Sequence, residues 1–433
     1  MSSTASARIG PVHLSEAHTF DVIIVGGGMV GMALAAALGG SPLRVAVVER
    51  MAPDISAGEG EYDLRVSAIT VASQRILENL GAWPGMEARR VSPFGEMDVW
   101  DAESPGHIHF DAAELGEPHL GHIIENRVVQ SALHDVVAAQ PNVELIQPAE
   151  IERMGWDADH MYLRLADGRM LAGGLMVGAD GGRSWVREQA GIESTGWDYG
   201  QTAIVATVRT SEPHRETAWQ RFLPEGPLAF LPLADGRCSI VWSAATEHAE
   251  ELLAMEPDAF RAELGRAFDH RLGTVEAVGE RAGLPLRLNH ARAYVRPRLA
   301  LIGDAAHTIH PLAGQGVNLG LADAAVLAEV LLDARAERRG IGSIPVLRRY
   351  ERWRKADNLA MMAAMDGFKR VFGSELAPVR WARGLGLNLT HTVLPVKNTI
   401  MRHAMGLVGE QPRLARPAPS DEPQTPSTHG TRR

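Results

Sequence analysis

The chain has 433 residues, of which 45% are hydrophobic and 22% are charged, a composition typical of a soluble globular enzyme larger than one ordinary domain. Its formal net charge of -10 argues against a nucleic acid as the main partner. Cys238 is the only cysteine, which excludes an internal disulfide and a cysteine metal cluster and fits a reducing cytoplasm.

The first predicted element is a buried strand from Asp21 to Val25, followed by a glycine-rich turn and a helix. Gly26, Gly28 and Gly31 fit the pattern G-x-G-x-x-G. In that pattern the first glycine permits a tight turn, the second lets a pyrophosphate approach the backbone, and the third lets the helix pack on the strand. This unit therefore predicts a dinucleotide site.

A second strand, Arg44 to Val48, ends at Glu49, about 20 residues after the glycines, where an acidic residue binds ribose hydroxyls. An acid at this place favours the unphosphorylated adenosine ribose of FAD or NAD over that of NADP. A membrane span is the alternative, because the run from Val22 to Leu43 is uncharged and long enough. Its glycines, three of them consecutive, favour a buried strand and helix instead, and no signal peptide precedes them.

The middle of the chain alternates between helical and strand patterns. Its predicted helices cover residues 68–80, 128–139 and 247–272, and its strand patterns cover 97–110, 162–177 and 200–245, the last as a mostly antiparallel sheet.

A second carboxylate at a strand end follows the hairpin at 162–177, which has Asp167-Gly168 at its turn. The sequence there is Gly178-Ala179-Asp180-Gly181. This motif is either a turn with a helix N-cap or part of a cofactor site.

The most informative stretch runs from Arg298 to Asp323. Leu299 to Ile302 predict a buried strand that ends near a carboxylate, Asp304. The pair His310-Pro311 breaks the chain into a loop, because proline disfavours helix in the residue before it. A helix is predicted from Val317 onward, and its glycine-rich approach presents free N–H groups that suit an anionic ligand.

The C-terminal part is predicted to be helical and then disordered. Ile344 to Phe372 predicts one long helix, and Leu385 to Val408 predicts one or two amphipathic helices. From Pro412 the chain is rich in Pro, Ser and Thr, which indicates a disordered tail.

The glycine turn at 26–31, the motif at 178–181 and Gly303-Asp304 together resemble the single-component flavoprotein aromatic hydroxylases. The run from His310 to Asp323, HPLAGQGVNLGLAD, is more specific and is similar to the signature of the ubiquinone-biosynthesis hydroxylases. The resemblance covers about residues 20–408. It implies an α/β fold (mixed α+β): a Rossmann-like FAD-binding domain, an interleaved antiparallel-sheet substrate domain and C-terminal helices. The implied boundaries are 20–95, 121–195 and 290–375 for the FAD-binding domain, 96–120 and 196–289 for the substrate domain, 376–410 for the C-terminal helices and 411–433 for a disordered tail.

The resemblance assigns cofactor roles to residues of all three motifs and implies no metal site. The turn glycines would hold the FAD pyrophosphate, Glu49 the adenosine ribose and Asp304 a ribityl hydroxyl. Arg65 and Arg127 would lie along the cofactor, with a surface or structural role as the alternative for each. The full predicted set is Gly26, Gly28, Met29, Val30, Gly31, Glu49, Arg50, Arg65, Arg127, Asp180, Asp304, Gly316, Val317 and Asn318.

The implied reaction is the FAD-dependent hydroxylation of an aromatic ring. NADPH or NADH would reduce FAD, and O2 would then form a flavin C4a-hydroperoxide that oxidises a polyprenyl phenol of ubiquinone biosynthesis. The loop beside the flavin ring would contain His310, Pro311, Gly314 and Gln315, with His310 as either a base or a residue that orients the loop. The alternatives are a hydroxylase of another phenol, a polyprenyl or flavin reductase on the same fold, and a non-catalytic flavin-binding regulator.

The enzyme is expected in the cytoplasm. Because a polyprenyl phenol lies in the bilayer, the enzyme is also expected to be peripheral to the inner membrane. It would take its substrate from the membrane surface, from a lipid carrier or within a biosynthetic complex. The predicted contact is Leu385 to Val408, whose apolar side chains would enter the interface with Lys397 and Arg402 near anionic headgroups. The alternative is that this segment simply covers the FAD-binding domain.

Overall fold

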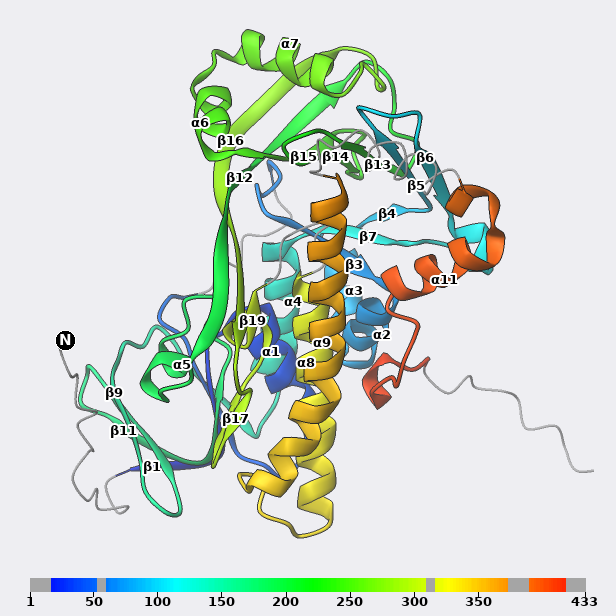
Figure 1. Cartoon of the computed structure of the whole chain (residues 1–433). Coiled ribbons are helices and arrows are strands. Elements are labelled where there is room, and N and C mark those ends of the chain that lie inside the picture. The colour runs from blue at the N-terminus through cyan, green and yellow to red at the C-terminus, as the bar shows by residue number, and fades with distance from the viewer. Residues whose placement is uncertain (1–16, 53–59, 309–315, 373–388, 418–433) are drawn as a thin grey trace, which may run out of the picture.

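The computed structural model describes residues 17–52, 60–308, 316–372 and 389–417, which form three sheets with helices packed around them (Figure 1). The first sheet has the order β17-β18-β11-β1-β2-β8, in which β18, β11, β1, β2 and β8 are parallel. Its strands are largely apolar and buried, as expected of parallel strands covered on both faces. Their bounds are β1 His18–Val25, β2 Val45–Val48, β8 Val143–Ile146, β11 Met170–Gly178, β17 Val295–Arg296 and β18 Leu299–Leu301.

The hairpin predicted at 162–177 extends this sheet. Strand β9 (Ile151–Trp156) pairs with β10 (Met161–Leu165), and β10 pairs antiparallel with β11. Gly168 at the turn has φ +91°, which a residue without a side chain adopts readily.

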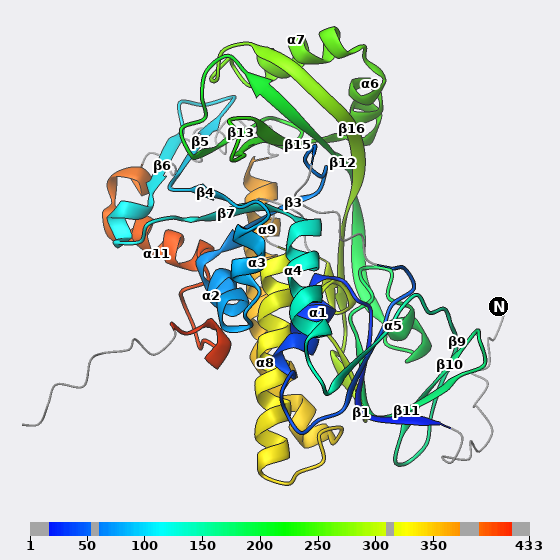
Figure 2. The same ribbon diagram turned by 180° about the vertical axis from the view of Figure 1, so that it is seen from behind.

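Helices cover the first sheet. Helix α1 packs against α4 and α8, and α8 packs in turn against α9, beside which it runs in both views (Figures 1 and 2). The long helix predicted at the C-terminal side is confirmed as α9. The bounds are α1 Met29–Ala37, α2 Val71–Asn79, α3 Trp83–Glu87, α4 Asn126–Ala138, α5 Trp185–Gln189, α8 Gly316–Ala336 and α9 Ile344–Phe372.

The second sheet is antiparallel except for one pair and confirms the predicted antiparallel sheet. Its order is β19-β16-β12-β15-β14-β13-β5-β6, and β13–β5 is the only parallel pair among the described strands of this sheet. Helices α6 (Thr246–Ala254) and α7 (Pro257–Ala267) cover one face of it at the top of Figure 1. The strands are β5 Glu96–Asp101, β6 His107–Asp111, β12 Ser194–Thr210, β13 Thr217–Phe222, β14 Pro227–Pro232, β15 Cys238–Ala245, β16 Val275–Ala291 and β19 His307–Thr308.

Side chains of β14 alternate between two apolar clusters, because successive residues of a strand point to opposite faces. Leu228 and Phe230 pack with side chains of α6 and α7. Ala229 and Leu231 belong to a separate cluster with Ile123. The second sheet therefore has one face covered by helices and another that faces the rest of the molecule.

A small third sheet lies between the second sheet and the helices in both views (Figure 2). It consists of β3 (Val66–Thr70), β7 (Gly121–Glu125) and β4 (Ser92–Phe94), in the order β3-β7-β4, and a 3₁₀ helix, η2 (Ala112–Leu115), precedes β7. The long strands β12 and β16 connect the lower and upper parts of the molecule (Figure 1). We keep the division into cofactor and substrate domains, with the boundaries given above, as a proposal.

The C-terminal segment corrects two expectations. Lys397 of helix α11 (Leu394–Ala404) is 2% exposed, and its Nζ lies 2.6 Å from Glu114 Oε1, so its predicted contact with lipid headgroups is wrong. The 3₁₀ helix η5 (Arg413–Ala415) lies where a disordered tail was predicted, yet Ala415 is buried and the backbone N–H of Arg413 donates to Glu329 (2.7 Å). The rest of the predicted tail lies outside the described residues. Among the described helices, none combines the length and apolar character needed to cross a membrane.

Candidate active site

Three of the predicted motifs meet at the carboxyl ends of neighbouring strands. Val25 of β1 pairs with Gly178 of β11, and Gly178 pairs with Leu301 of β18. The turns that follow these three residues are therefore side by side. The carboxyl ends of parallel strands are where open α/β sheets bind their ligands.

The glycines of the first turn have different structural roles. Gly26 has φ +110°, and a Cβ there would lie 2.4 Å from the carbonyl oxygen of Ala179. A Cβ on Gly31 would lie 2.0 Å from the carbonyl oxygen of Gly26, so only a glycine lets α1 pack this closely. A Cβ on Gly28 would meet no atom within 4 Å. The turn therefore leaves open space at its second glycine, as the approach of a pyrophosphate requires.

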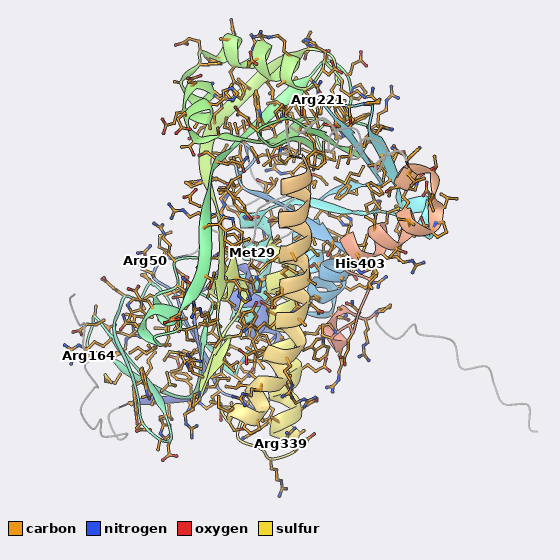
Figure 3. All side chains as sticks on the ribbon, viewed as in Figure 1. Met29, Arg50, Arg164, Arg221, Arg339 and His403 are labelled. Carbon is orange, nitrogen blue, oxygen red and sulfur yellow. The ribbon has the colours of Figure 1, made fainter. Side chains whose placement is uncertain are left out.

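Helix α1 begins at this open space without a side-chain cap. Its N-cap is Gly28, no side chain caps the N-terminus, and no acidic residue lies in the first turn. The first N–H groups of α1, at Met29 and Val30, are thus available to an anion at the positive end of the helix dipole. Figure 3 labels Met29 at this place. The side chain of Val30 also packs closely against α8, because a Cβ on Gly320 of α8 would lie 2.5 Å from it.

Glu49 connects the end of β2 to the first turn. Its Oε2 accepts a hydrogen bond from the N–H of Gly27 (2.7 Å), and its Oε1 accepts one from the N–H of Met51 (3.0 Å). Each carboxylate oxygen retains a second lone pair, which a ribose hydroxyl could use. Arg50 follows on the exposed surface (Figure 3). The ribose role of Glu49 and the cofactor role of Arg50 stay predictions.

The carboxylate of Asp180 supports the N-terminus of helix α5, whose N-cap residue is Ser184. Its Oδ1 accepts a hydrogen bond from the hydroxyl of Ser184, and its Oδ2 accepts one from the N–H of Val186 (2.9 Å). This geometry is the N-cap turn that the sequence left open as the alternative. A direct contact of Asp180 with the cofactor stays a prediction.

Arg187 of α5 ties the second turn to the third. Its guanidinium donates to the carbonyl oxygens of Ala305 (2.8 Å) and Gly182 (2.9 Å). Burial lowers the pKa of Arg187, partly offset by Asp180 and Glu188. The two turns are thereby held at a fixed separation.

Asp304 lies in the third turn, the 3₁₀ helix η3 (Gly303–Ala305), and is exposed. Desolvation nevertheless raises its pKa, against the opposing charges of His307 and Arg65. The electrostatic influence of Arg65 on Asp304 also brings together two residues predicted to contact the cofactor.

Arg127 lies beside the segment that carries Arg65. Its Nε is 3.5 Å from Asp63 Oδ2, and the backbone N–H of Asp63 donates to Glu125 (2.7 Å). The ion pair supports the structural alternative for Arg127, and its role along the cofactor stays a prediction.

Asn318 joins the first turn of α8 to the end of β3. Its side chain accepts from the N–H of Thr70 (3.1 Å) and donates to the carbonyl oxygen of Ala68 (2.8 Å). The side chain of Asn318 is therefore used within the protein. The N–H groups of Gly316, Val317 and Asn318 are in the first turn of α8, where backbone N–H groups have no acceptor within the helix itself. His310, Pro311, Gly314 and Gln315 lie outside the described residues.

An apolar wall lies on the face of the second sheet turned toward the third sheet. The apolar wall also has partly buried side chains packed against it, which are Val66, Ala68, Phe94, Met97 and Val241. Its buried members are Tyr62, Ile123, Ala218, Ala229, Leu231 and Leu233. The side chains at 68, 218 and 229 are small, and all of them are apolar.

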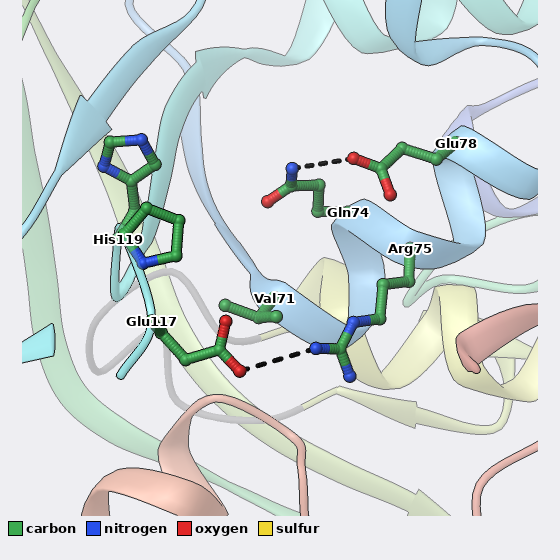
Figure 4. A pocket seen from close by; sticks show the side chains of 7 residues that line it. Val71, Gln74, Arg75, Glu78, Glu117 and His119 are labelled. Carbon is green, nitrogen blue, oxygen red and sulfur yellow. Dashed lines mark hydrogen bonds and ion pairs between the residues drawn. The ribbon is translucent and has the colours of Figure 1, made fainter. Parts of the chain in front are cut away.

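A shallow pocket of about 130 Å³ lies beside α2 (Figure 4). Its polar side chains already bind one another, since Arg75 pairs with Glu117 (3.5 Å) and Gln74 donates to Glu78 (2.8 Å). The lining contains none of the predicted cofactor residues, so we assign it no role in the reaction.

A buried network behind the third turn contains three residues that the sequence motifs did not indicate: His307, Asp323 and Arg354. Asp323 was visible only as the last residue of the signature. The one available signal was that it is the sole charged residue in the apolar run 319–328.

A glycine turn, an uncapped helix and a carboxylate at adjoining strand ends define a dinucleotide-binding flavoprotein. The sequence model of the family described as FAD binding domain matches residues 19–364. The 3-demethoxyubiquinol 3-hydroxylase of Escherichia coli (strain K12) is 41% identical over 387 residues, which cover 89% of this chain and 98% of that protein. The ubiquinone hydroxylase UbiL of Rhodospirillum rubrum is 43% identical over 413 residues, 95% of this chain and 96% of that protein. The chain belongs to this family of FAD-dependent monooxygenases, among the ubiquinone-biosynthesis hydroxylases.

Solved structures support the same fold. The p-nitrophenol 4-monooxygenase PnpA from Pseudomonas putida DLL-E4 has a TM-score of 0.74 at 20% identity, covering 91% of this chain and 100% of that one. The prediction of an α/β flavoprotein fold is therefore confirmed.

Proposed function

We propose that this protein hydroxylates the aromatic ring of a polyprenyl phenol in ubiquinone biosynthesis, with NADPH or NADH and O2 as co-substrates. The observation that carries the proposal is the meeting of the first and third turns at adjoining strand ends, with open space at Gly28 in the first turn and the accessible carboxylate of Asp304 in the third. The names of the relatives from E. coli and R. rubrum supply the substrate class.

The residues present fit FAD. The first N–H groups of α1 would face its pyrophosphate, Asp304 a ribityl hydroxyl, and the N–H groups of residues 316–318 the negative charge of its ring. Bound FAD supplies the redox chemistry by taking two electrons from NAD(P)H and passing them to O2. The apolar wall would exclude water and hold the phenol ring, and the loop with His310 and Pro311 is proposed to lie beside the reacting atoms.

Deletion of the gene tests the proposed reaction. Mass spectrometry of the lipid extract should show loss of ubiquinone and accumulation of a polyprenyl phenol that lacks one ring hydroxyl. The wild-type gene should restore ubiquinone, and a Gly28→Val variant should not. Unchanged ubiquinone in the deletion strain would contradict the proposal.

We also propose a peripheral contact between this cytoplasmic protein and the membrane that holds its substrate. Six of the ten exposed large hydrophobic side chains among the described residues lie between Leu389 and Val408. On α11, Val396 (48% exposed) and Ile400 (39%) are one helical turn apart, while Met401 faces the interior at 2%. One face of the segment thus covers the protein, as the alternative held, and the other is apolar and accessible.

Liposome flotation tests this contact. We expect the wild-type protein to float with anionic vesicles, and the double variant Val396→Ser/Ile400→Ser to remain at the bottom with normal FAD content. The control is Trp156→Ser on β9, which removes a side chain of similar exposure (50%) elsewhere. Equal flotation of all three proteins would contradict the contact and favour delivery by a carrier.

A further inference from the structure

The carboxylate of Asp323, on α8, is fully buried and accepts four hydrogen bonds. Its Oδ2 accepts from the N–H of Gly303 (3.0 Å) and from Nε2 of His307 (2.5 Å). Its Oδ1 accepts from Nε of Arg354 (2.7 Å) and from Nδ2 of Asn358 (3.3 Å). Both oxygens are therefore saturated by protein donors.

This carboxylate remains ionised despite its burial. Burial alone would raise its pKa, but the charges and hydrogen bonds of His307 and Arg354 outweigh burial and lower the pKa of Asp323 to about 2. Arg354 is itself only 6% exposed. A buried ion pair of this kind is often no more stabilising than well-packed apolar side chains, so stability alone does not account for it.

The four donors come from three structural units that must be placed together. Gly303 belongs to the third turn, has φ +58° and directly precedes Asp304. His307 is in β19, which pairs with β16 of the second sheet through His290. Arg354 is on α9, which packs against α8. One carboxylate thus connects the turn of Asp304, the edge of the second sheet and two helices.

The third turn and the start of α8 are both proposed to face FAD, and Asp323 lies on α8 two turns beyond Gly316. The bond from the N–H of Gly303 to Asp323 fixes the position of that turn relative to α8. Close packing reinforces the arrangement, because Val30 of α1 fills the space between Gly303 and Gly320.

We propose that Asp323 is a positioning residue for the cofactor, which holds the Gly303–Asp304 turn at a fixed place relative to the N-terminus of α8 and to the substrate sheet. The inference rests on the proposed placement of FAD. Asp323 acts through Gly303 and His307 and makes no contact with the cofactor itself.

The variant Asp323→Asn removes the negative charge of the side chain and keeps its size and shape. An amide offers one acceptor and one donor group in place of two acceptors. Whichever way the amide points, its NH₂ group faces either the N–H of Gly303 or the guanidinium of Arg354, and a donor then opposes a donor. We expect the Gly303–Asp304 turn to loosen and the dissociation constant of FAD to rise at least about tenfold.

FAD titration of apoprotein measures this effect without turnover. Apoprotein is prepared from wild type, Asp323→Asn and the control Asp333→Asn, and binding is followed by flavin fluorescence. Circular dichroism reports whether each apoprotein is folded. Asp333 is the matched control because it is on the same helix but pairs with Arg413 near the surface (2.7 Å, 20% exposed). At saturating FAD, Asp323→Asn should also show a visible flavin spectrum different from that of the wild type.

Folded Asp323→Asn apoprotein with weakened FAD binding and an altered spectrum, beside a normal Asp333→Asn, supports the proposal. Wild-type affinity and spectrum in Asp323→Asn would overturn it. If Asp323→Asn does not fold, the same titration is made with His307→Gln. This variant keeps an amide donor near Asp323 but removes the imidazole. A rise of about threefold or more in the FAD dissociation constant then supports the proposal, and wild-type affinity overturns it. A wild-type protein that binds no FAD at all would overturn the proposed function together with this inference.

Discussion

The turns after β1 and after β18 are both proposed to face FAD, but they are held in opposite ways. The first is shaped by the backbone, since side chains at Gly26 and Gly31 would collide with carbonyl oxygens. The third is held by side chains, through the carboxylate of Asp323 and the guanidinium of Arg187. The first turn thus depends on close packing, which tolerates no added atom at these two glycines. The third turn depends on charged side chains that come from distant parts of the chain.

The largest effect is expected at the steric turn. In Gly31→Val the new Cβ would lie 2.0 Å from the carbonyl oxygen of Gly26, and the backbone would have to move to relieve the overlap. We expect the free energy of unfolding to fall by more than about 3 kcal/mol, with loss of bound FAD. Urea unfolding and the flavin absorbance of the purified protein measure both.

Gly28→Val is the matched control for that variant. Its Cβ would meet no protein atom within 4 Å, so the unfolding free energy of the apoprotein should stay within about 1 kcal/mol of the wild type. The protein should still be colourless, because the side chain fills the proposed approach of the pyrophosphate. Gly28→Val protein that retains yellow FAD would show that the cofactor does not enter here.

A smaller effect is expected at the third turn from Asp304→Ala. Desolvation disfavours the charge of this carboxylate, so its removal should not lower the stability of the apoprotein. The dissociation constant of FAD should rise about tenfold if the carboxylate accepts a ribityl hydroxyl. Titration of the apoprotein with FAD measures this constant. An unchanged value would show that Asp304 does not contact the cofactor.

These two turns also show how far the sequence could predict the site. The glycine spacing defines the first turn locally, so the strand, turn, helix and acid at Glu49 were readable without a structure. The contacts of Asp180 could not be predicted, since a strand-end carboxylate has the same sequence pattern whether it binds a ligand or bonds to the N-terminus of a helix, as Asp180 does at α5. The bond between Asp323 and Arg354 depends on how α8 packs on α9, which local pattern does not specify.

The C-terminal segment illustrates the same difference. Its amphipathic pattern predicted helix α11 correctly, but it did not reveal which face would be buried. Lys397 is at the centre of the buried face because Glu114 of η2 offers it a partner, and η2 is far away in the sequence. A lysine in an amphipathic helix therefore cannot be assigned to lipid without knowing what lies opposite it.

The smallest expected effect concerns pH and the edge strands behind the third turn. Burial, with smaller contributions from Lys355 and His307, lowers the pKa of His290 to about 4. Because the folded-state pKa lies below the unfolded value, the stabilising contribution of neutral His290 is complete above about pH 6.5 and is lost as the pH falls toward 4. His290→Gln can still bond the hydroxyl of Tyr294 but does not titrate.

Urea unfolding at pH 7 and pH 5 measures this contribution. The wild type should lose about 1 kcal/mol more than His290→Gln between the two pH values, because His290 is only half-buried and solvent screens part of its charge. Other buried histidines such as His122 titrate in both proteins, so their effect cancels in the comparison. Identical losses would mean that His290 is not desolvated as the structure indicates.

Oxygen transfer by the purified holoprotein tests the central claim most directly. The protein, NADPH or NADH and a short-chain prenyl phenol are incubated under isotopically labelled O2, and the product is analysed by mass spectrometry. The account predicts FAD-containing protein and a phenol that gains one labelled oxygen atom on its ring. Oxidation of NAD(P)H without labelled product for every prenyl phenol tried, or a reduced prenyl chain in place of a hydroxylated ring, would contradict it.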